Sequence, residues 1–68
     1  MRKNLKEARK KAGMTQQQVA EYLEITLRSY QRLESGDMLG KISHWDALEA
    51  LFKIHQRELR LVTKSHLL

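Results

Sequence analysis

Arg28 and Arg32 are the side chains in this sequence best suited to directed contacts with another molecule. They lie four residues apart, so a helix places both guanidinium groups on one face, together with Leu27, Ser29 and Gln31. An α-helix fits the DNA major groove, where an arginine can grip guanine O6 and N7 with two hydrogen bonds. Charged residues on an exposed helix can also do no more than keep it soluble. To distinguish DNA contact from simple solvation, we consider the helices that position these residues.

The segment before this row carries a strong helix start signal. Thr15 can cap the free amides of the next turn, and Gln18 stands three residues later, as in a capping box. Met14 before the cap and Val19 after it have the spacing of a hydrophobic staple. These signals predict a helix over residues 16–23.

A second start signal follows almost at once. Thr26 can cap a new helix, Ile25 and Tyr30 repeat the staple spacing, and Gly36 is suited to end the helix in the left-handed conformation. The pattern predicts a helix over residues 27–35. Two capped helices with so few residues between them cannot lie end to end, so they must turn sharply against each other.

The apolar residues of these two segments predict how the helices pack. They are spaced so that two steeply crossing helices share one seam, and Ala20 is small where the helices approach most closely. Burial of this seam leaves the start of the second helix exposed, with Leu27 and Arg28 upon it. The residues of the seam are Val19, Leu23, Ile25, Tyr30 and Leu33.

Helical spacing also occurs on both sides of this pair. Leu5, Ala8 and Ala12 mark a first helix, which Gly13 is placed to terminate. We expect residues 37–42 to form a loop.

The fourth helix is predicted to start at Ser43 as its cap, with Asp46 favourably placed in the first turn. A break near residues 54–55 precedes a last helix, in which Leu59 and Val62 are expected to face the core. The apolar face of the fourth helix consists of Trp45, Leu48, Leu51 and Phe52.

From Thr15 to Gly36, the sequence TQQQVAEYLEITLRSYQRLESG resembles the helix-turn-helix of the Cro and lambdoid-repressor class, the XRE-type family of bacterial and phage transcriptional regulators. The resemblance extends back through LKEARKKAG and forward through WDALEALFKIHQREL, so it covers nearly the whole chain. It implies an all-α, compact five-helix, lambda-repressor-like domain with the helix-turn-helix at helices 2 and 3. We expect this domain to span residues 1–62. A short tail over 63–68 is expected to be disordered or part of a dimer contact.

The resemblance also implies roles for individual residues. Leu27, Arg28 and Arg32 occupy positions that the family uses to read base edges. Gln16 opens a helix that in the family often touches a phosphate and supports the recognition helix. Arg9 and Glu34 match a structural ion pair between the first helix and the recognition helix. The full set of expected DNA-binding residues is Gln16, Gln17, Thr26, Leu27, Arg28, Ser29, Gln31 and Arg32.

Three features depart from the family's pattern. Glu24 stands where the turn usually has glycine, and a left-handed residue with a side chain costs roughly 1 kcal/mol or more in strain. Leu27 replaces a commonly polar base reader, so it would meet a thymine methyl group or pack against sugar. The loop before Ser43 is longer than usual and lacks the family's proline, which leaves its phosphate contacts open.

The composition is compatible with this interpretation. The 68 residues carry a formal net charge of +5, which suits a polyanion, although basic helices also meet membranes and acidic proteins. The basic stretch from Lys3 to Lys11 is either a phosphate contact or a solvated face. The absence of cysteine and of an apolar run of roughly 20 residues predicts a soluble, cytoplasmic protein.

No set of residues predicts catalysis or metal binding. His44, His55 and His66 lack the close pairing typical of zinc ligands, and no cysteine joins them. The carboxylates are scattered, no nucleophile has an evident base, and no Gly-rich phosphate loop is present. We therefore expect no enzyme activity, no metal, no cofactor and no small-molecule ligand.

Two function hypotheses remain. The first is sequence-specific binding of double-stranded DNA by a transcriptional regulator, most simply a repressor, and a homodimer would bind an inverted-repeat operator. The second is a protein-interaction module of the same fold, antitoxin-like or an adaptor, with DNA binding secondary. The apolar residues Leu61, Val62, Leu67 and Leu68 either extend a dimer interface or belong to a frayed end.

Overall fold

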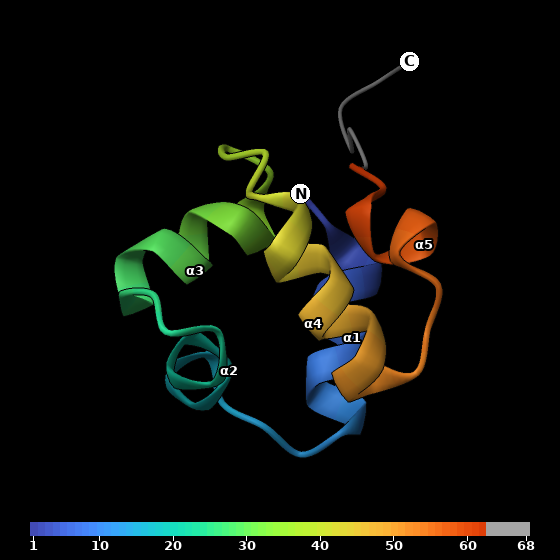
Figure 1. The fold of residues 1–68 in the computed structure, drawn as a ribbon, viewed down its shortest axis with the longest axis horizontal. Helices are drawn as coiled ribbons and strands as arrows, with labels where there is room; N and C mark the ends of the chain where they lie inside the picture. Colours follow the sequence, from blue (N-terminus) through green and yellow to red (C-terminus); the bar gives the residue numbers. More distant parts are fainter. Residues whose placement is uncertain (63–68) are drawn as a thin grey trace.

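The computed structural model describes residues 1–62, which form five α-helices (Figure 1). This part of the chain contains no strand, so the prediction of an all-α, five-helix fold is confirmed. The expected tail at 63–68, with Leu67 and Leu68, lies outside the described residues. The helices are α1 (Lys3–Lys11), α2 (Gln16–Leu23), α3 (Leu27–Ser35), α4 (Ile42–Phe52) and α5 (Gln56–Arg60).

Helices α2 and α3 begin and end where their capping signals predict. Thr15 Oγ1 accepts a 3.1 Å hydrogen bond from the Gln18 amide, and Gln18 Oε1 accepts one of 2.8 Å from the Thr15 amide. This reciprocal pair is a capping box, which satisfies two amides that the helix itself leaves without partners. Thr26 caps α3 through one hydrogen bond, which its Oγ1 accepts from the Ser29 amide, and Gly36 ends α3 at φ +94°.

The turn between α2 and α3 is short because the chain closes tightly on the end of α2. The Ile25 amide donates a 3.0 Å hydrogen bond to the Ala20 carbonyl, and Glu24 adopts the left-handed conformation at φ +60°. Glu24 thus takes the conformation in which its side chain adds strain. Ala20 is fully buried, which agrees with the need for a small residue at the helix crossing.

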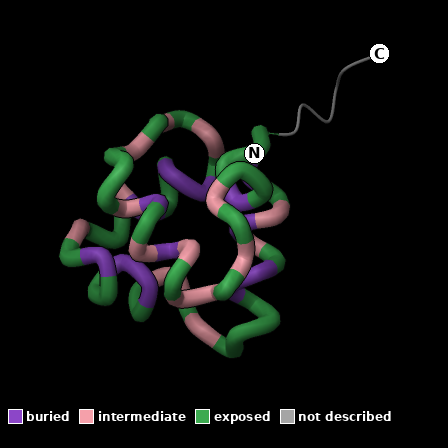
Figure 2. Tube along the Cα trace, turned by 45° about the vertical axis from the view of Figure 1, so that its right-hand side comes forward, coloured by how far each residue is buried: buried purple, intermediate pink, exposed green. Residues whose placement is uncertain are grey.

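The apolar faces of the five helices meet in one core. Figure 2 shows buried stretches alternating with exposed ones along the chain, as expected for amphipathic helices. α3 packs on α2, while α5 packs on both α1 and α4. The buried apolar residues are Leu5, Ala8, Val19, Ala20, Leu23, Tyr30, Leu33, Trp45, Leu48 and Leu59.

The start of α4 differs from the prediction. The helix begins at Ile42, directly after Lys41, and no side chain caps it, so Ser43 is not a cap. Asp46 lies beyond the first turn, where its carboxylate accepts a 2.7 Å hydrogen bond from Gln56 Nε2. Asp46 therefore ties α4 to α5 instead of stabilising the start of α4.

Gly40 lies tightly against the core just before α4. Its φ of +78° favours glycine, and a Cβ atom there would lie only 2.6 Å from Leu33 Cδ1 and 3.2 Å from Trp45 Nε1. The Trp45 indole N–H also donates a 2.9 Å hydrogen bond to the Leu39 carbonyl. These contacts hold the loop before α4 against the core.

The end of the described chain contains a second correction. Leu59 is fully buried as predicted, but Val62 is 47% exposed, so the expectation that it faces the core is wrong. The chain leaves the helical conformation at Leu61, which lies at φ −56° and ψ 130°. His55 begins α5 by accepting a 3.1 Å hydrogen bond at Nδ1 from the Arg57 amide.

Arg2 anchors the N-terminal segment in the core. Arg2 directly precedes the basic stretch from Lys3 to Lys11, yet it is only 2% exposed. Its Nη1 donates to the carbonyls of Leu33 at 2.6 Å and Met38 at 2.7 Å, and its Nε donates to the Arg60 carbonyl at 3.1 Å. One guanidinium thus joins the end of α3, the following loop and the end of α5.

Candidate nucleic-acid interface

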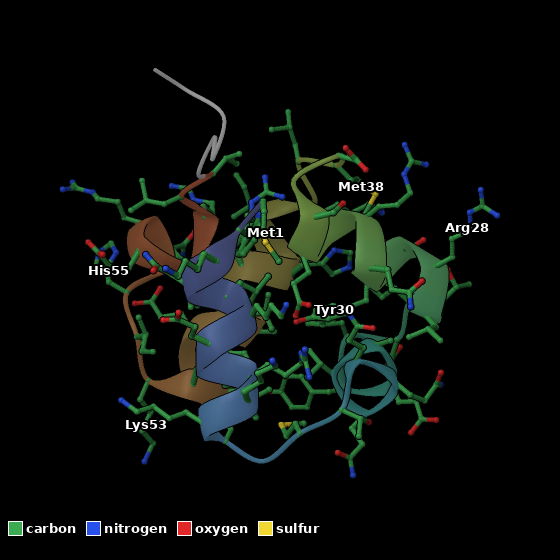
Figure 3. All side chains as sticks on the ribbon, turned by 180° about the vertical axis from the view of Figure 1, so that it is seen from behind. Met1, Arg28, Tyr30, Met38, Lys53 and His55 are labelled. Atoms are coloured by element: carbon green, nitrogen blue, oxygen red, sulfur yellow. The ribbon has the colours of Figure 1, made fainter. Side chains whose placement is uncertain are left out.

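The outer face of α3 is exposed along the helix while its inner face is buried. Figure 3 shows Arg28 extending away from the body of the protein and Tyr30 pointing into it. Leu33 and Glu34 are buried with Tyr30. We call the exposed set the outer row; it consists of Leu27, Arg28, Gln31 and Arg32.

The hydroxyl groups of Thr26 and Ser29 lie together at the start of the outer row. Thr26 Oγ1 accepts a 3.1 Å hydrogen bond from the Ser29 amide and donates one of 2.9 Å to Ser29 Oγ. This pairing fixes the orientation of both hydroxyl groups at the N-terminus of α3. The free amides there give this end of the helix a partial positive charge.

Gln16 joins the start of α2 to α3. Its Nε2 donates a 2.9 Å hydrogen bond to Glu34 Oε1, and its Oε1 accepts a 3.2 Å hydrogen bond from Gln31 Nε2. Gln17, beside it, is exposed and donates a 3.0 Å hydrogen bond to Glu21 Oε2 one turn along α2. Of the two glutamines, Gln16 is therefore the one whose side chain bonds to α3, while that of Gln17 bonds within α2.

The carboxylate of Glu34 is the centre of a buried hydrogen-bond network. Arg9 Nε lies 2.8 Å from Glu34 Oε2, and the two side chains are 10% and 4% exposed. Arg9 Nη1 also donates a 2.9 Å hydrogen bond to the Met14 carbonyl, just before α2. The network therefore ties α3 to α1 and to the segment that enters α2.

Tyr30 completes the network from within α3. Its hydroxyl donates a 2.7 Å hydrogen bond to Glu34 Oε2. Burial alone would raise the pKa of Glu34, but the hydrogen bonds from Arg9, Tyr30 and Gln16 hold that pKa below its usual value. Burial and the bond to Glu34 raise the pKa of Tyr30, and the bond to Glu34 raises the pKa of Arg9. Glu34 is thus kept charged and Tyr30 kept protonated.

Sequence reasoning paired Glu34 with Arg9 and expected Gln16 to support α3, but it did not predict the bonds that Tyr30 and Gln16 make to Glu34. One signal was available, because Tyr30 and Glu34 are four residues apart and share a face of α3. The contact of Gln16 with Glu34 and Gln31 depends on how α2 crosses α3, and no local pattern carries that information.

The described residues offer no arrangement suited to metal chemistry. Within residues 1–62, no three His, Cys, Asp or Glu side chains come close enough to hold a metal ion. His44 lies in the first turn of α4, His55 caps α5, and His66 lies outside the described part. In the same part of the chain, no helix is both long and apolar enough to cross a membrane.

Comparison with known proteins identifies the class to which these features belong. No curated protein and no solved structure matches the chain. The sequence profile of a helix-turn-helix family matches residues 5–59, from within α1 to within α5. The match contains both capped helices and the whole outer row. The chain therefore belongs to the XRE-type helix-turn-helix family, a family of DNA-binding transcription regulators and not of enzymes.

Proposed function

We propose that this protein is a sequence-specific transcriptional repressor that inserts α3 into the major groove of double-stranded DNA. The observation that carries the proposal is the outer row, which is exposed on a helix whose opposite face is buried. Two of its members are arginines, and the acidic residue of α3, Glu34, is buried away from them. Arg28 is suited to guanine recognition, and Leu27 is suited to a thymine methyl group.

The residues around the outer row are suited to the DNA backbone. Gln16 and Gln17 lie at the N-terminus of α2, where free amides favour a phosphate. Thr26 and Ser29 present hydroxyl groups at the start of α3. We assign these four residues to phosphate or nearby base contacts, which position the protein without necessarily reading sequence.

The buried network supports the proposal because it ties α3 to both α1 and α2. Gln16 joins α3 to α2, and Arg9 joins it to α1, through the same carboxylate of Glu34. A side chain on a rigid helix loses less conformational freedom on binding than one on a mobile segment. The Glu34 network thus contributes to DNA affinity without touching DNA.

We further propose that two copies occupy an inverted-repeat operator. In helix-turn-helix dimers with two-fold symmetry, the recognition helices enter half-sites about one helical turn of DNA, roughly 34–36 Å, apart. Repression then follows from occupancy, because the bound protein excludes other proteins from the same site.

Selection of binding sites from a random DNA pool tests the DNA-binding part of the proposal. We expect one discrete motif with two-fold symmetry. Affinity for it should fall steeply with salt, with a log–log slope of about −0.9 for each phosphate contacted. Failure to enrich any motif, or affinity for all duplexes alike, would contradict sequence-specific binding.

A matched pair of variants separates the outer row from general charge. Arg32→Gln and Lys53→Gln each remove one positive charge, but Lys53, directly after α4, lies on the opposite side of the molecule from Arg28 (Figure 3). Arg32→Gln should weaken binding to the selected site, by about 10-fold if one contact of about 1.4 kcal/mol is lost, whereas Lys53→Gln should change it little. If both variants weakened DNA binding equally, the affinity would depend on net charge and not on the outer row.

A reporter gene placed downstream of the selected site tests the sign of regulation. Expression of the protein should lower transcription from the reporter, and the Arg32→Gln variant should lower it less. An increase in transcription would contradict the repressor assignment and leave the DNA-binding assignment in place.

A further inference from the structure

A groove of about 500 Å³ lies beside α4 and α5, among segments that are far apart in the sequence. Its apolar lining includes Leu39 and Ile42, around the start of α4, and Leu61 and Val62, after α5. Arg57 and Arg60 of α5 also line it. We call this feature the arginine-rimmed groove. None of its residues belongs to α3.

Large apolar side chains are unusually exposed around the groove. Leu39 is 82% exposed, Ile42 73%, Leu61 50% and Val62 47%. A single exposed leucine needs no explanation, but several gathered around one concave surface are typical of a protein-binding site. The groove is therefore suited to a partner that offers apolar side chains of its own.

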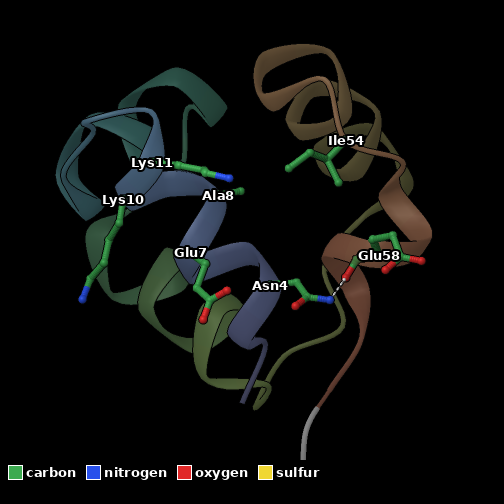
Figure 4. A pocket seen from close by; sticks show the side chains of 7 residues that line it. All are labelled: Asn4, Glu7, Ala8, Lys10, Lys11, Ile54 and Glu58. Atoms are coloured by element: carbon green, nitrogen blue, oxygen red, sulfur yellow. Dashed lines mark hydrogen bonds between the residues drawn. The ribbon is translucent and has the colours of Figure 1, made fainter.

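The charge of the groove narrows the choice of partner. Arg57 and Arg60 are exposed, and no acidic residue is among the described residues that line the groove. The pocket between α1 and α5 shows the contrast (Figure 4): its charged residues are Glu7, Glu58, Lys10 and Lys11, so the two signs balance. The arginine-rimmed groove presents positive charge alone.

Arg2 adds a buried positive charge at the same place. Its guanidinium carbon lies 5.1 Å from the centre of the Trp45 ring, and both residues line the groove. Within residues 1–62, the hydrogen-bond partners of Arg2 are carbonyl groups and no carboxylate pairs with it. Burial, and then the charge of Arg60, lower the pKa of Arg2, so a negative charge nearby would stabilise its charged form.

We propose that the arginine-rimmed groove binds an acidic amphipathic helix of another protein. The apolar face of that helix would cover Leu39, Ile42 and Leu61, while its carboxylates would pair with Arg57 and Arg60. This is the usual manner in which an amphipathic helix occupies an apolar groove. Two-fold pairing of two copies through the groove would instead bring the arginines of both copies together, which is unfavourable.

This interaction goes beyond DNA binding and is compatible with it. Because the groove contains no residue of α3, a partner seated there leaves the outer row exposed. The arginine-rimmed groove would therefore be a second binding site on a DNA-bound regulator.

Two synthetic peptides that differ only in charge test the proposal. Both are amphipathic helices of about 18 residues, five turns, with identical leucine positions; one carries glutamates on its polar face and the other lysines. Trp45 is the one tryptophan of the chain and lines the groove, so its fluorescence reports directly on occupancy. The glutamate peptide should bind saturably and change the emission of Trp45. The lysine peptide should bind at least about 10-fold more weakly because like charges oppose it.

Charge-reversal variants test whether Arg57 and Arg60 determine which of the two peptides binds. The double variant Arg57→Glu/Arg60→Glu should bind the lysine peptide in preference to the glutamate peptide. Lys53→Glu, an exposed residue outside the groove, should keep the wild-type preference. Circular dichroism tests whether each variant is folded. Affinity for the selected DNA, measured in parallel, tests whether α3 still binds DNA.

Three results would overturn the proposal. The first is that neither peptide binds, or that both bind equally. The second is a dimer of the free protein that Ile42→Glu dissociates, since a second copy would then occupy the groove. The third is that the glutamate peptide binds only after deletion of residues 63–68, which would assign the groove to that segment. Each result leaves the proposed DNA-binding function standing, because DNA affinity is measured separately.

Discussion

The Arg9 guanidinium and the Glu34 carboxylate form a two-point contact between α1 and the last turn of α3. Arg9 Nε lies 2.8 Å from Glu34 Oε2, and Arg9 Nη2 lies 3.4 Å from Glu34 Oε1. Both groups are nearly excluded from solvent. A buried charge that loses its partner is strongly unfavourable, so each member of the pair requires the other.

Arg9→Met should therefore destabilise the protein strongly. The variant leaves the Glu34 carboxylate buried without its counterion, and we expect the free energy of unfolding to fall by about 3–5 kcal/mol. That is a large share of the roughly 5–15 kcal/mol that stabilises an ordinary domain. Urea unfolding followed by circular dichroism measures the change.

Lys3→Met is the matched control for this prediction. Lys3 and Glu7 form an exposed pair at 4.0 Å, and an exposed pair contributes only about 0–1 kcal/mol. A similar small loss for both variants would show that the buried pair adds no more than an exposed one.

Stability should depend on pH through Glu34. Its pKa in the folded protein lies below the ordinary value of 4.5, so at acidic pH the unfolded chain binds more protons than the folded one. The stabilisation is present above the ordinary value and is lost as the pH falls through the lower folded pKa. Between about pH 6 and about pH 3, the wild type should lose more free energy of unfolding than Glu34→Gln does. Urea unfolding at several pH values measures this difference.

Glu7→Gln removes an exposed carboxylate from α1 and serves as the control for the pH series. Its pH profile should follow that of the wild type. If Glu34→Gln also followed the wild type, the acid sensitivity would have another source.

The helix-turn-helix could be predicted from the sequence because its signals are local. Each cap links Thr15 or Thr26 to an amide three residues later, and the glycine that ends α3 acts through its own backbone angles. The alternating exposure of α3 follows from helical spacing, so the outer row could be predicted as well. The family resemblance, and not a local pattern, supplied the pairing of Arg9 with Glu34.

The parts that sequence reasoning missed depend on contacts between distant segments. Before α4, Gly40 packs against Leu33 and Trp45, and the helix begins at Ile42 without the side-chain cap predicted at Ser43. Arg2 is buried because three carbonyl groups from separate segments meet around it. Neither the packing of Gly40 nor the burial of Arg2 can be predicted from the residues next to it in the sequence.

Glu24→Gly should stabilise the protein. Glu24 has φ +60°, and a residue with a side chain in this conformation costs roughly 1 kcal/mol more than glycine. The greater freedom of glycine in the unfolded chain offsets part of this gain, so we expect an increase of about 0.5 kcal/mol in the free energy of unfolding. Glu24→Ala removes the charge but keeps the Cβ atom, and it should give no such gain. A decrease for Glu24→Gly would show that the turn is not strained.

Arg28 should read a base. Arg28→Ala should cost about 1–3 kcal/mol on the selected site and relax the preference at one base pair. Arg28→Lys should lose the same preference while it keeps more of the affinity, because lysine has the charge but not the two-point fork. Lys10→Ala, on α1, should act uniformly on all sequences if it acts at all. Binding-site selection repeated with each variant measures the preference, and uniform weakening by Arg28→Ala would assign Arg28 to a phosphate.

The most direct test is to map the surface that DNA covers. Backbone amide NMR spectra of the protein, recorded during titration with the selected duplex, report each residue separately. We predict the largest shifts over residues 26–32 and at Gln16 and Gln17, with small shifts around Ile42 and Leu61. Large shifts confined to α4 and α5, with the amides of α3 unchanged, would contradict the assignment of the outer row to DNA.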